Sequence, residues 1–243
     1  MRTIEKHCKF ETRGSVTIGG LRLGDLGLLW VNAEIAEPET KTNIISVQTQ
    51  NGNVDLTNAL INYAVFENRT IQLEFILLDR DMREWQAVDS KLKNYCHGKI
   101  MDIVLDTDMG HYWRGRCSVS SSKEDWVHSK FIISVDAAPY KYDVVSTAGD
   151  WLWDTLDMVD GHINEMGNLS VDGTLEVVLI GSALRAVPEI IASAPMSVEY
   201  QGKLYELKSG SSKIYDIYIG PGEHRLKFTG SGVVTIDYRG GSL

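Results

Sequence analysis

Apolar and polar residues alternate in several short stretches of the first half of the chain, as expected for strands with one buried face. Ile71, Leu73 and Phe75 share one face of the clearest stretch. The pair Asn51-Gly52, a strong hairpin signal, follows another. The four predicted strands of this part are residues 15–18, 28–36, 42–50 and 70–78.

A different period appears in residues 82–96. Trp85, Val88 and Leu92 recur at spacings of three and four, which places them on one face of a helix. Gly98 follows, and glycine commonly ends helices. The pattern therefore predicts a single amphipathic helix in an otherwise strand-rich region.

Strand-like segments resume after this helix. Residues 99–105 and 112–120 flank the turn-forming segment 106–110, which predicts a hairpin. Residues 130–135 add a further strand, and Pro139-Tyr140 closes the unit.

The last part of the chain consists of short apolar runs separated by glycine-containing turns, with no helical period. This arrangement is typical of a β-sandwich or jelly roll. The predicted strands are residues 174–180, 197–200, 204–207, 214–219, 225–228 and 233–238. The predicted turns between them include residues 201–202, 209–210, 220–222 and 230–232.

We therefore expect a mainly β protein with one helix and two domains. Residues 1–145 form the first domain, with the helix at 82–96. Residues 146–168, rich in Asp, Gly and Trp and without a clean period, form a linker, and residues 169–243 form the sandwich.

Composition narrows the functional classes. The chain has 243 residues, of which 43% are hydrophobic and 23% charged, a balance typical of soluble globular domains. Its three cysteines, Cys8, Cys96 and Cys117, form no CxxC pair, which argues against a disulfide framework or a zinc knuckle. No signal peptide or membrane-spanning run is evident. We expect synthesis in a reducing cytoplasm.

The net charge of −9 argues against nucleic-acid binding as the main role. Proteins that hold DNA neutralise phosphates with clustered cations.

The segment 106–110 (DTDMG) resembles the start of a calcium loop, in which oxygen ligands alternate and a glycine allows a tight turn. The glutamate that would complete such a loop is missing, because aromatic and basic residues follow. A hairpin turn explains the same residues. The neighbouring pairs His7-Cys8 and Cys96-His97 also lack partners at metal-ligand spacing.

Carboxylates are abundant, but no hydrolase motif or phosphate-binding glycine loop accompanies them. We therefore assign no catalytic, cofactor-binding or metal-binding residue, although a hydrolase remains a third and weaker interpretation. The carboxylates concerned are Asp106, Asp108, Asp150, Asp154 and Asp157.

Trp151 and Trp153 lie two positions apart and would face the same side of an extended segment. Such a pair can stack on a sugar or anchor a neighbouring subunit. Domain packing or a subunit contact is the better interpretation of the two tryptophans.

Seven segments, in order, resemble motifs of the distal tail proteins of siphophages. The departure is at residues 43–50, where that family often has a more basic, glycine-rich approach to its turn. The matching segments are residues 24–28 (GDLGL), 51–57 (NGNVDLT), 97–99 (HGK), 106–116 (DTDMGHYWRGR), 138–142 (APYKY), 221–224 (PGEH) and 233–243 (VVTIDYRGGSL).

This resemblance implies a ring-forming N-terminal β domain with one helix and a C-terminal galectin-like jelly roll. It also implies a virion protein, assembled in the bacterial cytoplasm, whose six copies join the tail tube to the baseplate around a DNA channel. The implied partners are the tail tube protein, a tail-associated fibre or lysin protein and receptor-binding proteins. No enzyme activity, cofactor or membrane insertion is implied.

A carbohydrate-binding module of an adhesion apparatus is the alternative. Against it, residues 169–243 contain no tryptophan and only one histidine, His224, whereas galectin-type sites use both residue types.

Overall fold

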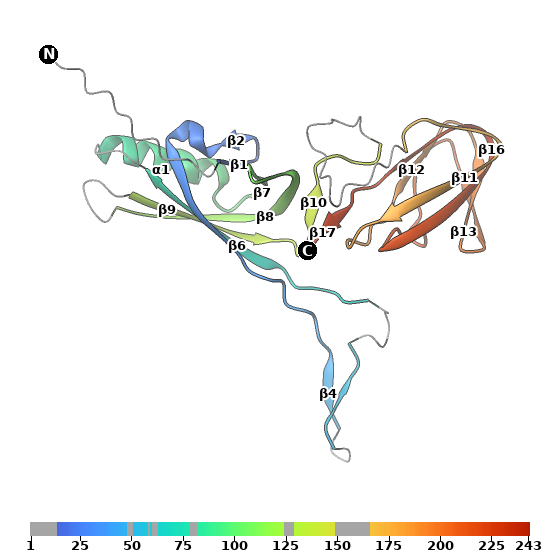
Figure 1. Cartoon of the computed structure of the whole chain (residues 1–243), viewed down its shortest axis with the longest axis horizontal. Coiled ribbons are helices and arrows are strands. Elements are labelled where there is room, and N and C mark those ends of the chain that lie inside the picture. Colours follow the sequence, from blue (N-terminus) through green and yellow to red (C-terminus); the bar gives the residue numbers. More distant parts are fainter. Residues whose placement is uncertain are drawn as a thin grey trace. The chain divides into compact units, whose positions relative to one another are not determined.

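A computed structural model describes residues 14–47, 51–57, 59, 63–77, 82–123, 129–148 and 166–243. The described chain is mainly β with a single α-helix, which confirms the predicted fold class. It divides into two compact units (Figure 1). Unit 1 comprises residues 1–108 and 113–139, and unit 2 comprises residues 109–112 and 140–243. The predicted linker lies largely outside the described residues, so the division at residues 145 and 168 stays a prediction.

Unit 1 is built on one antiparallel sheet with the strand order β2-β1-β7-β8-β9-β6-β3. The short 3-10 helix η1 (Leu23–Leu26) connects β2 to β3. The strands are β1 (Val16–Ile18), β2 (Leu21–Arg22), β3 (Leu28–Ile35), β6 (Arg69–Leu77), β7 (Ile100–Leu105), β8 (Asp108–Lys123) and β9 (Ser129–Ala137).

Strand alternation produces the core of unit 1. Ile71, Leu73 and Phe75 of β6 are fully buried on one face, as their sequence pattern predicts. Helix α1 (Met82–Cys96) lies over the sheet (Figure 1) and buries Leu92 and Cys96. Because these residues lie four apart, the buried stripe follows one helix face.

The end of α1 is fixed by its connection to the sheet. Gly98 has a positive φ of 77°, a conformation that glycine adopts without strain. Its N–H donates to the carbonyl of Cys117 in β8 at 2.7 Å. No helix in the described part of the chain is long and apolar enough to cross a bilayer.

A two-stranded ribbon, which we call the arm (the described residues within 37–68), lies between β3 and β6 in the chain. It contains β4 (Ile44–Ser46) and β5 (Asn53–Asp55), which pair with each other alone among the described strands. Figure 1 shows this ribbon reaching beyond the sheet of unit 1.

Unit 2 contains a sandwich, and its longest strand pair is β11 with β16. β10 (Lys141–Asp143) pairs with β17 (Gly241–Ser242) and with the first residues of β8. The sandwich strands are β11 (Leu169–Gly181), β12 (Glu189–Ala192), β13 (Met196–Tyr200), β14 (Lys203–Leu207), β15 (Gly210–Lys213) and β16 (Gly222–Asp237).

Strand β16 pairs with two different strands in succession within one six-stranded sheet. Residues 226–229 pair with β13, whereas residues 234–237 pair with β12. Gly230 and Gly232 lie between these two parts, with φ of 152° and 150°. A strand that bends in this way forms the corner of a sandwich.

Three sequence predictions for unit 2 were therefore wrong in detail. Residues 225–228 and 233–238 belong to one strand, because Gly230-Ser231-Gly232 forms a bend and not a turn. Residues 214–219 form a turn-containing loop, with only Ile219 in an isolated bridge to Ala186. Strands β12 and β15 were missed, since β12 is short and β15 (GSSK) carries no apolar residue.

Candidate functional site

The acidic segment at the β7–β8 hairpin has a structural role at its first residue. The Asp106 carboxylate accepts a hydrogen bond from the Ser15 N–H at 2.8 Å and another from Arg22 Nη2 at 2.6 Å. These bonds hold the start of β1 and the end of β2 against the hairpin. Within the described residues no three His, Cys, Asp or Glu side chains converge as a metal site would require.

The two described cysteines are inert thiols in the core of unit 1. Cys96 and Cys117 are fully buried, and burial raises their pKa to about 11 and about 12. Both therefore stay protonated at neutral pH, whereas the thiolate is the nucleophile and metal ligand. His97 accepts the Val119 N–H at Nδ1, 2.9 Å away, so its ring is part of the helix-to-strand connection.

Several sequence candidates lie outside the described residues, and their roles stay predictions. They are His7, Cys8, Asp150, Trp151, Trp153, Asp154 and Asp157.

The arm is held by backbone pairing without a core of its own. The Lys41 N–H donates to the Val65 carbonyl at 2.8 Å, and the Glu67 N–H donates to the Glu39 carbonyl at 2.7 Å. No described residue between 37 and 68 is buried. An isolated two-stranded ribbon is marginally stable in water, so this arm lacks the packing that normally stabilises such an element.

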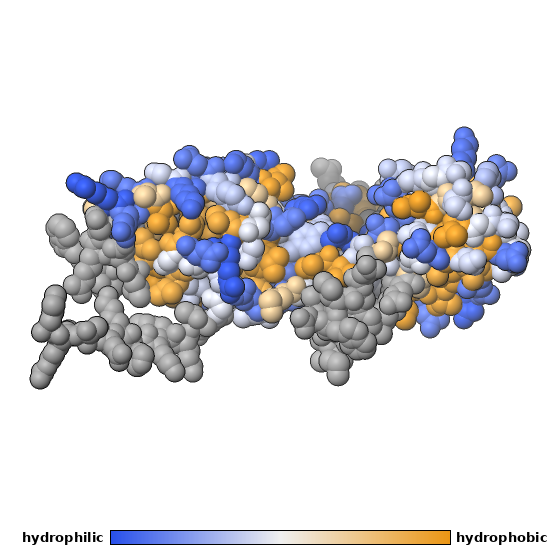
Figure 2. Space-filling model, turned by 90° about the horizontal axis from the view of Figure 1, so that it is seen from above, coloured by the Kyte–Doolittle hydropathy of each residue, from blue (hydrophilic) through white to orange (hydrophobic). Residues whose placement is uncertain are grey.

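Apolar side chains nevertheless lie on the arm. Ile44 is 53% exposed and Ile45 is 42% exposed, and Leu56 and Tyr63 are exposed as well. Apolar areas also occur elsewhere on the surface (Figure 2). Since no described residue of the arm is buried, such exposed apolar side chains are typical of an element that packs against another molecule.

Arg69 lies where the arm rejoins the sheet, with its side chain only 3% exposed. Its guanidinium carbon is 4.8 Å from the centroid of the Trp113 ring. Nη2 lies 3.8 Å from Oε2 of the exposed Glu37, and neither Nε nor Nη2 has a hydrogen-bond partner. Burial lowers the pKa of this guanidinium, because the surroundings disfavour its charge.

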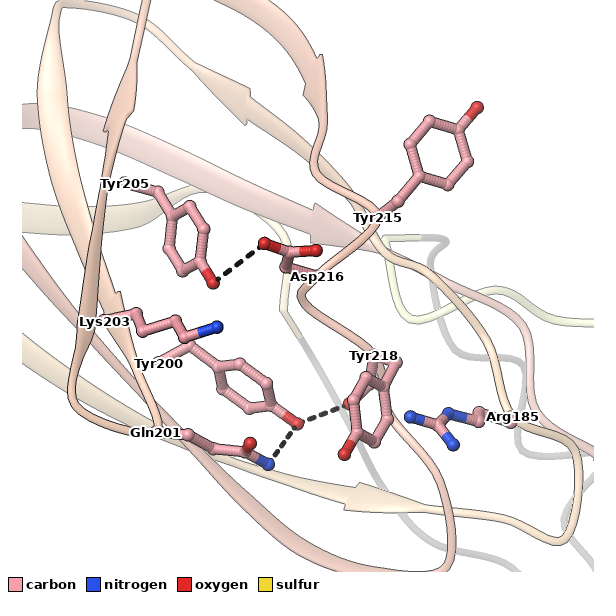
Figure 3. Close-up of a pocket in the computed structure, with 8 residues that line it drawn as sticks. All are labelled: Arg185, Tyr200, Gln201, Lys203, Tyr205, Tyr215, Asp216 and Tyr218. Atoms are coloured by element: carbon pink, nitrogen blue, oxygen red, sulfur yellow. Dashed lines mark hydrogen bonds between the residues drawn. The ribbon is translucent and has the colours of Figure 1, made fainter. Parts of the chain in front are cut away.

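Unit 2 contains a pocket of about 320 Å³, which we call the tyrosine pocket (Figure 3). One wall comes from the β13–β14 hairpin and another from the loop of residues 214–219. The lining residues are Arg185, Tyr200, Gln201, Lys203, Tyr205, Tyr215, Asp216 and Tyr218.

Tyr200 joins the two walls of the tyrosine pocket. Its ring is 2% exposed, and its hydroxyl donates to the Tyr218 carbonyl at 2.6 Å. The Gln201 amide donates to the same hydroxyl at 3.1 Å, and His224 Nδ1 lies 2.9 Å from it. Burial, followed by the neighbouring Tyr218, raises the pKa of Tyr200. The hydroxyl is therefore a neutral structural group at physiological pH.

The rim of the pocket combines charge with aromatic rings. The Arg185 guanidinium carbon lies 3.2 Å from the centroid of the Tyr218 ring. The Tyr205 hydroxyl donates to Asp216 Oδ2 at 3.4 Å. Tyr215 is 78% exposed, and Figure 3 shows its ring projecting outward from the loop.

This pocket was not predicted from the sequence, because only the tryptophan and histidine of a galectin-type site were considered there. The available signal was the density of tyrosine, since four of the ten in the chain fall within residues 200–218. The arm was not predicted as a separate ribbon, because the sequence pattern indicated only a strand at residues 42–50 followed by a turn at Asn51-Gly52.

Comparison with known proteins gives a likeness of fold at low sequence identity. No family model matches the chain, and no curated protein matches it. The crystal structure of the SPP1 Dit protein aligns with a TM-score of 0.63 at 12% identity, over 94% of this chain and 99% of that one. That protein is described as a paradigm of the hub adsorption apparatus in phages infecting Gram-positive bacteria.

Two structures of the phage p2 baseplate, in its activated conformation with Sr and with Ca, align at TM-scores of 0.37 and 0.39. They are 9% and 8% identical and cover 92% and 91% of this chain and 97% and 93% of those chains. At these scores they are too distant to support an inference.

Proposed function

We propose that this chain is the distal tail protein of a siphophage or prophage. Six copies form a ring that joins the tail tube to the baseplate, and DNA passes through its centre. The protein acts as a structural component of the virion and carries out no catalysis. The observation that carries the proposal is the likeness to SPP1 Dit, which extends over nearly the whole length of both chains.

The arm supports self-assembly. Ile44, Ile45, Leu56 and Tyr63 offer apolar surface on a ribbon without a core. A neighbouring copy of the same chain, with the open edge of its own sheet, supplies the missing packing. The apolar surface buried in this way stabilises the arm and the interface together.

The edges of the unit 1 sheet support a ring in particular. Within the described residues, β2 and β3 each pair on one side only. The eight-residue strand β3 also leads directly into the arm. A head-to-tail interface that closes into a ring pairs such edges and leaves none open to aggregation.

The charge of the chain fits a conduit. With a net charge of −9, the protein as a whole repels the phosphate backbone. A channel through which DNA slides gains from weak contacts. The expected neighbours are the tail tube protein, a tail-associated fibre or lysin protein and receptor-binding proteins, and assembly takes place in the bacterial cytoplasm.

Native mass spectrometry with negative-stain imaging tests the ring. The expected result is an open ring of six 27.1-kDa chains. Replacing Ile44 and Ile45 with serine is expected to shift the assembly to monomer. Ile191→Ser in unit 2 is the matched control, since Ile191 is 43% exposed and Ile45 is 42% exposed.

A monomer at the highest soluble concentration would contradict self-assembly, and a closed ring with another copy number would contradict the hexamer. Rings that survive in the arm variant but not in the control would show that the interface lies elsewhere.

A further inference from the structure

We propose that the tyrosine pocket of unit 2 binds a saccharide that carries an acidic group. The pocket differs in place and composition from the Trp151-Trp153 pair considered from the sequence. Its volume of about 320 Å³ falls in the range of small-molecule sites, roughly 300–1,000 Å³. Four properties of its lining favour such a ligand: aromatic rings, planar polar groups, cations and rigidity.

A tyrosine side chain can bind a sugar because each has an apolar face and polar groups at its edge. The ring of a tyrosine can pack against the C–H face of a pyranose while its hydroxyl reaches the sugar hydroxyls. Tyr205 is partly buried in the wall, whereas Tyr215 is 78% exposed at the rim. When a ligand covers a large aromatic ring that was exposed to water, apolar surface is buried, and this burial favours binding.

Two planar polar groups also line the pocket. Gln201 contributes an amide and Asp216 a carboxylate, and each can bind two neighbouring hydroxyls of one sugar. The Tyr205 hydroxyl bonds to one oxygen of Asp216 at 3.4 Å and so orients the carboxylate. A carboxylate oxygen can accept more than one hydrogen bond, so this contact leaves acceptor capacity for a ligand.

The charges of the lining favour an acidic ligand. Arg185 and Lys203 supply two positive charges against the single negative charge of Asp216, in a chain whose net charge is −9. Figure 3 shows Lys203 and Arg185 on opposite sides of the pocket, with Tyr200 and Tyr218 between them. The guanidinium is stacked on Tyr218, and its planar fork matches a carboxylate or phosphate group.

The pocket is also preformed. Tyr200 ties the β13–β14 hairpin to the 214–219 loop through its 2.6 Å bond to the Tyr218 carbonyl. Tyr200 and Tyr218 also make an edge-to-face contact, with ring centroids 6.0 Å apart. A site whose walls are already joined loses little entropy when a ligand binds.

The biological source of the ligand rests on the proposed function: a tail protein would meet such saccharides in the acidic polysaccharides of the bacterial surface. Binding itself does not depend on the ring. The assembly state of every sample is therefore measured separately by light scattering.

The test uses saturation-transfer NMR and titration calorimetry on the full chain. The acidic probes are a galacturonate tetrasaccharide and sialyllactose, the neutral probe is maltotetraose, and inorganic phosphate is the probe without a sugar. We expect saturable binding of at least one acidic saccharide, weakened by salt, with maltotetraose and phosphate at least tenfold weaker.

Tyr215→Ala and Lys203→Gln are expected to weaken this binding at least tenfold, since both side chains are exposed and their replacement leaves the fold intact. Leu204→Ala is the matched control, because Leu204 lies between Lys203 and Tyr205, is 68% exposed and does not line the pocket.

Three results would overturn the proposal: no binding of either acidic saccharide, equal binding of maltotetraose or phosphate, or an equal loss in the Leu204 variant. If the original chain forms the ring but binds neither acidic saccharide, the pocket proposal alone is refuted. If it binds an acidic saccharide but forms no ring, the assembly proposal alone is refuted.

Discussion

The guanidinium of Arg69 lies against the ring of Trp113, 4.8 Å from its centroid, at the point where the arm rejoins the sheet. A buried cation is costly unless other groups compensate for its lost hydration. Here an aromatic face and the more distant Glu37 do so, while two guanidinium nitrogens lack hydrogen bonds. The contact between the Arg69 side chain and Trp113 therefore stabilises the fold. Its buried charge, with two nitrogens that lack hydrogen bonds, destabilises it.

This arrangement predicts different effects for two substitutions. Arg69→Ala removes the packing of the long side chain, and we expect it to lower the free energy of unfolding by about 2–4 kcal/mol. Arg69→Met keeps an apolar stem against Trp113 and removes the buried charge, so we expect less than half that loss. Urea unfolding measures both, and equal losses would contradict the packing argument.

The buried thiols predict an alkaline loss of stability. The folded-state pKa values of Cys96 and Cys117, about 11 and about 12, lie above those of unfolded thiols. Their contribution is therefore complete below the unfolded pKa and decreases as pH rises toward the folded values. We expect the free energy of unfolding to fall by roughly 1.4 kcal/mol per pH unit for each thiol above about pH 9.

Urea unfolding at pH 7, 9 and 10.5 tests the thiol prediction, with Cys96→Ala and Cys117→Ala as the variants. Each variant should reduce the decrease in the free energy of unfolding per pH unit by the contribution of one thiol. A slope unchanged in both variants would assign the pH dependence to other groups.

The bend in β16 predicts a strict need for glycine. A Cβ at Gly230 would lie 2.7 Å from the Cβ of Met196, and the φ of 152° disfavours other residues. We expect Gly230→Ala to lower the free energy of unfolding by about 2–4 kcal/mol. Ser231→Ala, at the exposed position next to it, should change it by less than about 0.5 kcal/mol. Thermal unfolding of both variants provides the comparison.

We expect substitution of Asp106 to lower the stability of the fold and to leave the response to calcium unchanged. Asp106→Asn weakens the bonds to Arg22 and Ser15, and we expect a loss of about 1 kcal/mol in the free energy of unfolding. Millimolar calcium should leave the thermal midpoint of the original chain unchanged. A rise in that midpoint that disappears in the Asn variant would restore the calcium interpretation of this turn.

Local pattern was sufficient to predict the elements that have a continuous buried face. The alternation of Ile71, Leu73 and Phe75 predicted β6, and the spacing of Trp85, Val88 and Leu92 predicted α1. The glycines at 230 and 232 were misread because turns and strand corners use the same residue type. Only the partners of β16, which come from distant parts of the chain, distinguish the two.

The tyrosine pocket shows a second limit of sequence reasoning. The hydroxyl of Tyr200 meets the carbonyl of Tyr218 only because the hairpin and the loop fold toward each other. Neither segment carries a motif, so spacing alone does not reveal their convergence. The arm is similar, because its sequence is strand-like, and only the structure shows that β4 and β5 pair with no other described strand.

The pairing of β11 with β16 has a consequence for how unit 2 folds. Gly181 is opposite Gly222, so β12–β15 and their connecting loops are enclosed between the two strands. Strands β11 and β16, the two longest of unit 2, therefore cannot form a local hairpin. The chain between them must close as a loop before the two strands can pair. Because β16 pairs with β11, β12 and β13, these four strands should appear and melt as one kinetic unit.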